Sequence, residues 1–430
     1  MASAPAPDFV WRQSGGRYSP AVAETDTERT FRFERWRAIS GGVLESAATT
    51  FLLLIAVKHF QAGATAKALL SIGGSLGLLC GPMVVGVVER LRLPAAQAAS
   101  RLAAAGGVCM LIMAAVPTQA VYITGGMMAM ALASAIIPLM TQVYQDNYPE
   151  ALRGRLFSRA LMIRIGAALL FSAAGGWALD KHLDWFRVLL LLFGVAYFFS
   201  SWCFSRLPSR PLTPSGSSHP LRAFRYVRED RLFRWTLICW MLMGFANLMM
   251  YPLRVEYLAN PQYGSKLNVG EVALYVGVVP NLVRFALSPL WGWLFDRMNF
   301  FVMRIVLNLG FALGIVSFFV NPDNTTSLLV GAIVFGAANA GGDVAWGLWV
   351  TKLAPPDRVA DYMSVHTFFT GVRGVAAPLL AFHLVGTTGF GTLAWICGGL
   401  IVLSALMLVP EVHSGRALRK SVPLVEEVSE

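Results

Sequence analysis

The chain has 430 residues, of which 56% are hydrophobic and only 14% are charged, and its formal net charge is +11. A soluble protein carries about 25% charged residues, so this chain has too little polar surface to coat a water-soluble particle, and a soluble enzyme is excluded. The basic excess is typical of the cytoplasmic loops of a membrane protein, and no nucleic-acid partner is expected.

Residues 1–34 contain scattered Pro, Gly and charged residues without the apolar stretch of a signal peptide, which predicts a disordered cytoplasmic tail. Residues 411–430 predict a second such tail. The five cysteines lie far apart inside apolar runs, which predicts neither a metal site nor a disulfide framework. No metal or other cofactor is expected.

Between the tails, apolar segments of about 20 residues alternate with short polar stretches. Each is long enough to cross a bilayer as a helix, and continuous apolarity excludes the alternating pattern of a membrane β-barrel. The sequence therefore predicts an all-α integral membrane protein with twelve transmembrane helices. Their expected spans are 36–58, 68–89, 94–116, 119–143, 157–179, 185–205, 233–257, 270–293, 300–320, 326–350, 361–385 and 389–410.

One long connection, residues 206–232, is rich in Pro, Ser and Arg. It is interpreted as a cytoplasmic linker between an N-terminal six-helix bundle, 35–205, and a C-terminal six-helix bundle, 233–410.

An internal repeat supports this division into two halves. The pattern Pro-x6-acid-Arg of residues 82–90 recurs at 289–297, and the pattern of residues 149–158 recurs at 355–364 with nearly the same offset. Two landmarks with one offset indicate duplicated, pseudo-symmetric bundles.

Most of the 35 Lys and Arg residues fall on one side of the predicted membrane, in the linker, the tails and alternate loops. The positive-inside rule then places both termini in the cytoplasm and the chain in the cell membrane (the inner or plasma membrane).

Two loops carry an acidic-basic motif. Residues 292–297 read Gly-Trp-Leu-Phe-Asp-Arg, and a shorter copy, Glu89-Arg90, follows the second predicted helix. Placed after helices two and eight of a six-plus-six layout, this motif resembles the loop motif of the major facilitator superfamily, over about residues 35–410. The resemblance implies the fold of that family and alternating access about a site at mid-membrane.

The acidic-basic loops predict a cytoplasmic gate made of Glu89, Arg90, Asp296 and Arg297. A carboxylate at a helix end beside an arginine can hold the two bundles shut at the inner surface. Alternatively, the arginines are ordinary topology signals.

Charged residues inside membrane helices are costly and mark functional sites. Glu45 lies near the middle of the first predicted helix, and Asp343 lies in the tenth with Asn339 four residues before it and Trp346 three after it. Glu45 and Asp343 are predicted to carry the coupling proton, and Asn339 and Trp346 to line the solute site.

Arginines also lie inside the predicted helices. Arg164, Arg284 (with Asn281 on its face) and Arg373 are predicted to bind solute, with Glu45 pairing with Arg164 and Asp343 with Arg373. A fourth, Arg101, is close enough to the surface to extend its charge into water.

Asn247, which shares a stripe with Trp240 and Tyr251, is a further candidate for the solute site, although a lipid-facing stripe explains the spacing equally well.

The surplus of arginine over acid favours an organic anion or zwitterion as solute, because a guanidinium suits carboxylate or phosphate. The sequence therefore predicts a monomeric, proton-coupled secondary transporter (a symporter) of a small organic solute rather than an enzyme. A drug or lysolipid exporter on the same fold and a non-transporting membrane receptor or scaffold remain alternatives.

Overall fold

The computed structural model describes residues 25–211, 224–263, 267–320, 324–354 and 359–413. Within these ranges the chain is helical apart from short connections, and it contains no β-strand. The two predicted disordered tails lie outside the described residues, except for their inner ends, 25–34 and 411–413.

The first half of the chain forms the N-terminal bundle. Its helices are α1 (Asp26–Ser46), the π-helical turn η1 (Ala47–Phe51), α2 (Leu52–Lys58), α3 (Ala64–Ser71), α4 (Gly73–Arg90), α5 (Ala95–Ala115), α6 (Gln119–Ala135), α7 (Ile137–Asn147), α8 (Glu150–Lys181), the short η2 (Leu183–Trp185) and α9 (Phe186–Ser205).

The second half forms the C-terminal bundle. Its helices are α10 (Arg225–Glu229), α11 (Arg231–Ala259), the short η4 (Pro261–Tyr263), α12 (Val269–Ala273), the π-helical turn η5 (Leu274–Val278), α13 (Val279–Arg297), α14 (Phe300–Phe318), α15 (Thr325–Leu353), α16 (Val359–Thr388), α17 (Phe390–Leu408) and η7 (Val409–His413).

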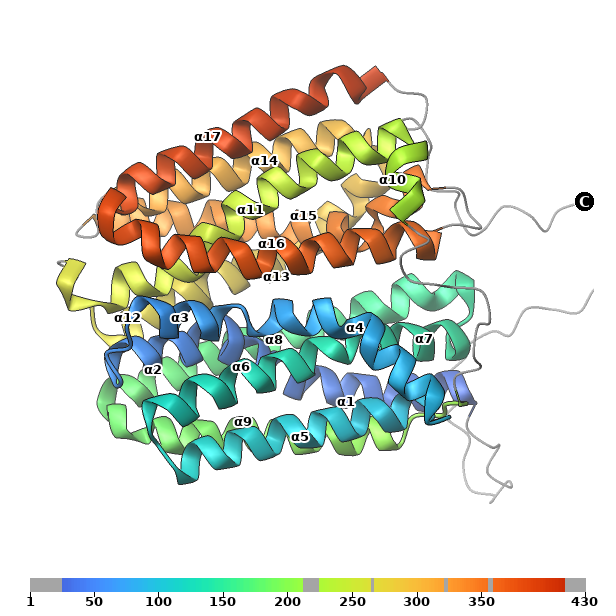
Figure 1. Cartoon of the computed structure of the whole chain (residues 1–430), viewed down its shortest axis with the longest axis horizontal. Coiled ribbons are helices and arrows are strands. Elements are labelled where there is room, and N and C mark those ends of the chain that lie inside the picture. The colour runs from blue at the N-terminus through green and yellow to red at the C-terminus, as the bar shows by residue number, and fades with distance from the viewer. Residues whose placement is uncertain (1–24, 212–223, 264–266, 321–323, 355–358, 414–430) are drawn as a thin grey trace, which may run out of the picture.

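The membrane-spanning architecture predicted from the apolar segments is confirmed. Eleven helices of the described chain are long and apolar enough to cross a membrane, and the bent pair formed by residues 64–71 and 73–81 makes a twelfth. The two halves lie one above the other in Figure 1, with blue-to-green helices below and yellow-to-red helices above.

Side-chain caps fix the starts of several helices, among them α1. Thr25 and Glu28 form a capping box at the start of α1, and Thr27 donates a hydrogen bond to the carbonyl of Asn147 on α7. This local and tertiary support corrects the predicted tail: residues 26–34 extend the first helix instead of being disordered.

The predicted linker, 206–232, is also partly helical. Residues 225–229 form α10, and α11 begins at Arg231, where the Asp230 side chain caps it by accepting from the amide of Phe233. Residues 212–223 of this linker lie outside the described chain.

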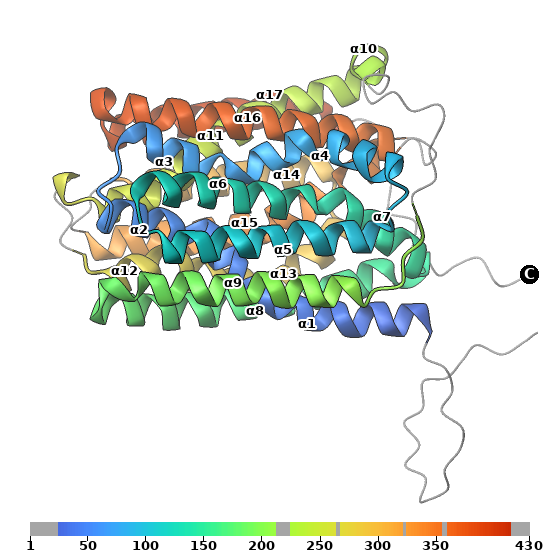
Figure 2. The ribbon, with the colours of Figure 1, turned by 60° about the horizontal axis from the view of Figure 1, so that its bottom comes forward.

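We call the end of the molecule where α9 ends and α10 begins the linker end, and the opposite end the far end. The first described helix begins and the last one ends at the linker end, as Figures 1 and 2 show. The basic residues Arg90, Arg206, Arg231 and Arg297 lie at helix ends on this side.

The two bundles are joined in their middle and at the far end. There Lys67 on α3 pairs with Glu256 on α11, both buried, and Thr65 lies 3.3 Å from His383, Oγ1 to Nε2. Near the middle, Arg284 on α13 pairs with Glu45 on α1. The structure therefore shows a state closed at the far end.

Candidate functional site

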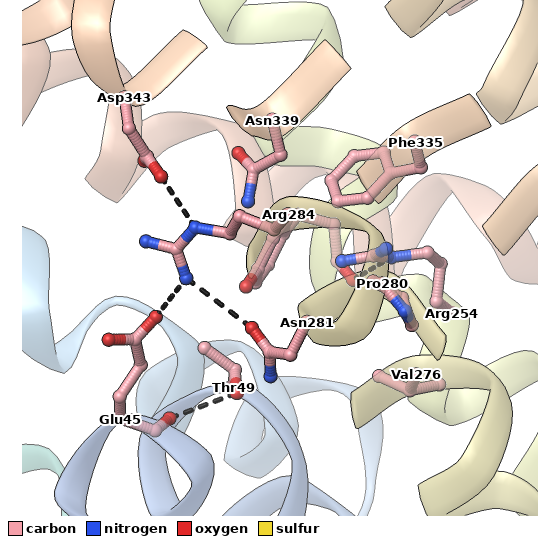
Figure 3. Close-up of a pocket in the computed structure, with 11 residues that line it drawn as sticks. Glu45, Thr49, Arg254, Val276, Pro280, Asn281, Arg284, Phe335, Asn339 and Asp343 are labelled. Carbon is pink, nitrogen blue, oxygen red and sulfur yellow. Dashed lines mark hydrogen bonds and ion pairs between the residues drawn. The ribbon is translucent and has the colours of Figure 1, made fainter. Parts of the chain in front are cut away.

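A cavity of about 200 Å³ lies between the two bundles at mid-height (Figure 3). Residues of α1 and η1 line it from the N-terminal bundle, and residues of α11, η5, α13 and α15 line it from the C-terminal bundle. The lining residues are Glu45, Thr49, Tyr251, Arg254, Val276, Pro280, Asn281, Arg284, Phe335, Asn339 and Asp343.

Arg284 on α13 lies at the centre of the cavity's charged groups. Its guanidinium donates through Nε to Asp343 on α15 and through Nη1 to Glu45 on α1, and Figure 3 shows it between the two carboxylates. Nη1 also lies 3.4 Å from the Asn281 side-chain oxygen one turn earlier. Arg284 thus links α15 to α13 within one bundle and joins that bundle to α1 of the other.

Glu45 has a second cationic partner in its own bundle. The Nε of Arg164 on α8 lies 2.7 Å from Glu45 Oε2. The predicted Glu45–Arg164 pair is therefore present in the structure. The predicted Asp343–Arg373 pair is wrong, because Asp343 pairs with Arg284.

Two π-helical turns lie beside these charges. Glu45 comes two residues before η1, which contributes Thr49, and η5 contributes Val276. A π-helical turn widens the helix by one residue per turn and occurs most often at functional sites. The two turns contact each other across the bundles, so both halves have irregular backbone at the cavity.

Arg254 on α11 is a cavity cation that has no acidic partner among the described residues. Its guanidinium lies 3.8 Å from the ring centre of Phe335 and 4.5 Å from that of Tyr251, and its Nε donates to the Tyr251 carbonyl. The side chain is buried, and Nη1 has no hydrogen-bond partner. Aromatic faces hold this charge without neutralising it.

The remaining predicted solute-binding residues do not line the cavity. Arg373 donates 2.6 Å to the Trp240 carbonyl inside the C-terminal bundle, because α16 packs on α11. Trp346 packs against His366, and Asn247 holds a buried side-chain oxygen without a partner. Tyr251, from the same stripe as Asn247, does line the cavity.

The predicted gate residues lie at the linker ends of α4 and α13. Arg297 is stacked over the ring of Trp293, 4.5 Å from its centre. Glu89 and Arg90 form no ion pair with any described residue. The side chain of Asp296 lies outside the part of the structure that is described.

Sequence reasoning missed Arg254, Thr49 and the Lys67–Glu256 pair. Arg254 and Lys67 lie near the ends of apolar segments, where a basic residue is ordinarily a topology signal. Arg254 lies inside the predicted span 233–257, three residues after Tyr251, and Thr49 lies one turn after Glu45. This helical spacing is the sequence signal from which both residues could have been identified.

Among the described residues, no group of three or more His, Cys, Asp or Glu side chains lies together as a metal site would require. The polar groups that line the cavity are two carboxylates, two guanidinium groups, two amides and two hydroxyls, and the guanidinium of Arg164 adjoins them through Glu45.

The fold and the site define the class of protein: a polytopic membrane protein of two six-helix bundles with a charged cavity between them. The family model of the Major Facilitator Superfamily matches residues 38–320 and 261–427. The chain belongs to the major facilitator superfamily and has the transporter fold of that family.

Solved structures show the same fold. A nucleoside transporter, NupG in a D323A mutant form, superposes with a TM-score of 0.70 at 15% identity, over 89% of this chain and 99% of that one. A POT family transporter in complex with a thioalcohol-conjugated peptide gives 0.68 at 12% identity, over 90% and 96%. A D-xylose-proton symporter gives 0.63 at 15%, over 89% and 95%.

Proposed function

We propose that this protein is a proton-coupled secondary transporter that moves a small organic solute with a carboxylate or phosphate group across the cell membrane by alternating access. The observation that carries the proposal is the cavity between the bundles, where Arg254 has no acidic partner and Arg284 is shared by two carboxylates.

The charge balance of the site favours an anionic group on the solute. The charges of Glu45 and Asp343 are balanced by those of Arg164 and Arg284, to which they are paired. Arg254 leaves one positive charge at the cavity. A carboxylate or phosphate that accepts from its free Nη1 would neutralise this charge, and Tyr251 and Phe335 supply apolar contact for the rest of the solute.

Coupling follows from competition for Arg284. When a proton neutralises Glu45 or Asp343, Arg284 loses one of its anionic partners. The N–H group that this partner occupied can then donate to an anionic solute. Proton binding therefore raises the affinity for the anionic solute, and by linkage the solute raises the affinity for the proton. Asn281 and Asn339, which lie beside Arg284, are the neutral groups that orient the solute.

The orientation follows from the charge distribution. Arginines at the linker end place that end, and both termini, in the cytoplasm by the positive-inside rule. The structure is then an inward-facing state. In the opposite state, Glu89, Arg90, Asp296 and Arg297 would meet between the bundles and close the cytoplasmic side while the Lys67–Glu256 pair opens.

Uptake into proteoliposomes tests the proposal. The solute panel consists of small carboxylates and phosphate esters, each with a neutral analogue such as the corresponding amide or alcohol. We expect uptake of a charged member that is accelerated by an imposed proton gradient. Uptake confined to neutral, amphipathic or lysolipid solutes would favour an exporter of such compounds, and no uptake of any member would favour the receptor alternative.

Variants then separate the roles of the charges. Arg254→Gln should raise the KM for the charged solute at least tenfold, since a charge-assisted hydrogen bond contributes about 1.5–3 kcal/mol. Arg101→Gln, which alters an exposed arginine of α5, is the matched control. Glu45→Gln and Asp343→Asn should abolish acceleration by the proton gradient while leaving solute exchange, which needs no net proton movement. Acceleration that survives in both variants would contradict the coupling scheme.

A further inference from the structure

A second charged cluster lies inside the C-terminal bundle, apart from the cavity. We call it the Trp240 cluster; it consists of Trp240 on α11, Arg304 on α14, Trp349 on α15, and His366 and Arg373 on α16. Arg304 is 1% exposed, His366 0% and Arg373 9%. None of the five lines the cavity, and the transport scheme above uses none of them.

The two arginines are held by the same residue. The guanidinium of Arg304 lies 3.7 Å from the ring centre of Trp240, and Arg373 donates through Nη1 to the Trp240 carbonyl. The His366 ring lies 5.3 Å from the Trp240 ring and 5.1 Å from the Trp349 ring, centre to centre. Helices α14 and α16 thus bring two cations and an imidazole to one tryptophan of α11.

Several polar atoms of the cluster have no partner. Nε and Nη1 of Arg304, Nε of Arg373, both ring nitrogens of His366 and the indole Nε1 of Trp349 are buried without a hydrogen bond. Within the described part of the chain, the Arg304 side chain donates a single hydrogen bond, to the Asn308 side-chain oxygen 3.0 Å away. Unmet donors on buried cations are among the most costly features that a protein interior can contain.

No carboxylate neutralises this charge. Neither Arg304 nor Arg373 forms an ion pair with any residue of the described chain, whereas the buried Arg284 and Lys67 each have an acidic partner. Asp343 on the neighbouring α15 forms its ion pair with Arg284. Glu411 in η7 forms no ion pair with any described residue. Arg373 instead adds a second positive charge near Arg304, since both side chains contact Trp240.

We propose that a small inorganic anion, such as chloride, binds between Arg304 and Arg373 and completes the packing of the C-terminal bundle. It would accept from the free Nε and Nη1 of Arg304, from Nε of Arg373 and from a ring N–H of His366. The low exposure of all three side chains and the tight aromatic packing restrict the site to a monatomic or similarly small anion. The site is distinct from the solute cavity, so a solute carboxylate does not compete for it.

The first test is the melting temperature of the purified full-length protein in detergent, with chloride or bromide replacing gluconate at constant ionic strength. An anion that binds only the folded state raises the melting temperature continuously with its concentration above its Kd. We expect this rise in the wild type, its loss in Arg304→Gln, and its retention in Arg254→Gln and in the exposed control Arg101→Gln.

Two outcomes would overturn the proposal: a melting temperature that does not respond to halide in the wild type, or a response lost in Arg254→Gln and kept in Arg304→Gln, which would place the halide in the cavity. Wild-type crystals grown in bromide provide an independent test that does not depend on the folding of Arg304→Gln. An anomalous peak between Arg304 and Arg373 is expected, and diffraction data without one would refute the site.

Discussion

Arg284 is the residue on which the geometry of the cavity depends. It holds Glu45 of one bundle and Asp343 of its own, and it is 7% exposed. In the proposed coupling scheme, protonation of Glu45 weakens the link across the interface, whereas protonation of Asp343 weakens a contact inside the C-terminal bundle.

Replacement of Arg284 should destabilise the protein because it leaves a partly buried carboxylate unpaired. Arg284→Gln leaves Asp343 without a cationic partner, while Glu45 keeps Arg164. We expect a loss of about 3 kcal/mol in stability, the low end for breaking a buried pair because Asp343 is 28% exposed. The double variant Arg284→Gln/Asp343→Asn should recover most of the melting temperature but not transport. A double variant no more stable than the single one would contradict this assignment.

Exchanging the charges of Glu45 and Arg164 should not restore transport activity. An isolated ion pair tolerates reversal, but an arginine at position 45 would face Arg284, which donates to Glu45 in the native protein. We therefore expect Glu45→Arg/Arg164→Glu to be no more active in proteoliposome uptake than Glu45→Arg alone. Rescue by the exchange would show that Arg284 does not hold Glu45 during transport.

At the scale of elements, close helix contacts decide where the bundles can meet. A Cβ on Gly176 of α8 would lie 2.5 Å from the Cβ of Ala273 on α12, and one on Gly277 of η5 would lie 2.9 Å from the Cβ of Ser172. Backbone at such distances leaves no room for a methyl group, so the far-end closure depends on these small residues.

The contact between α8 and α12 can be tested by moving the methyl group of Ala273 to position 176. Gly176→Ala should destabilise the protein by about 1–3 kcal/mol, as overpacking does, and lower its melting temperature. Gly176→Ala/Ala273→Gly moves the methyl to the other helix and should restore stability. Gly399→Ala, on α17 with no neighbour within 4 Å of the added Cβ, is the control. A double variant as unstable as Gly176→Ala would show that another neighbour limits the space.

At the scale of the whole molecule, the buried Lys67–Glu256 pair stabilises closure of the far end. Glu256 Oε1 accepts from Lys67 and from the Asn260 side chain, 2.8 Å away. Removing one partner leaves the other charge buried in the closed state but hydrated in the open one. The balance between inward- and outward-facing states should therefore shift toward opening at the far end.

Cross-linking across the far end measures this shift. In a background without the native cysteines, Thr65→Cys and His383→Cys place two thiols on opposite bundles at a point where the native side chains approach within 3.3 Å. We expect a short bifunctional thiol reagent to link them, and Glu256→Gln to reduce the linked fraction. Glu271→Gln, which removes a charge near the start of α12 while glutamine can still accept the capping-box hydrogen bond, is the control. An unchanged fraction in Glu256→Gln would rule out the pair as a far-end lock.

The predicted spans match the helices closely, since the residues that must face lipid are apolar over a full bilayer thickness and this pattern is local. The start of α1 was missed because its first turns are polar and are held by Thr25, Glu28 and Asn147 rather than by apolarity. The partners of buried charges were harder to predict. Asp343 and Arg373 were paired by their similar depth, yet α15 packs on α13 and α14, while α16 packs on α11 and on the other bundle.

The sequence by itself determined the membrane-spanning segments, the two-bundle division and the identity of the charged residues inside them, because bilayer thickness and the cost of intramembrane charge act on each segment separately. Only the tertiary structure decided which of these charges meet. It placed Arg284 between Glu45 and Asp343 and left Arg254 unpaired at the cavity, because the rotation of each helix about its axis is set by packing against its neighbours, and residues at equal depth can face different directions.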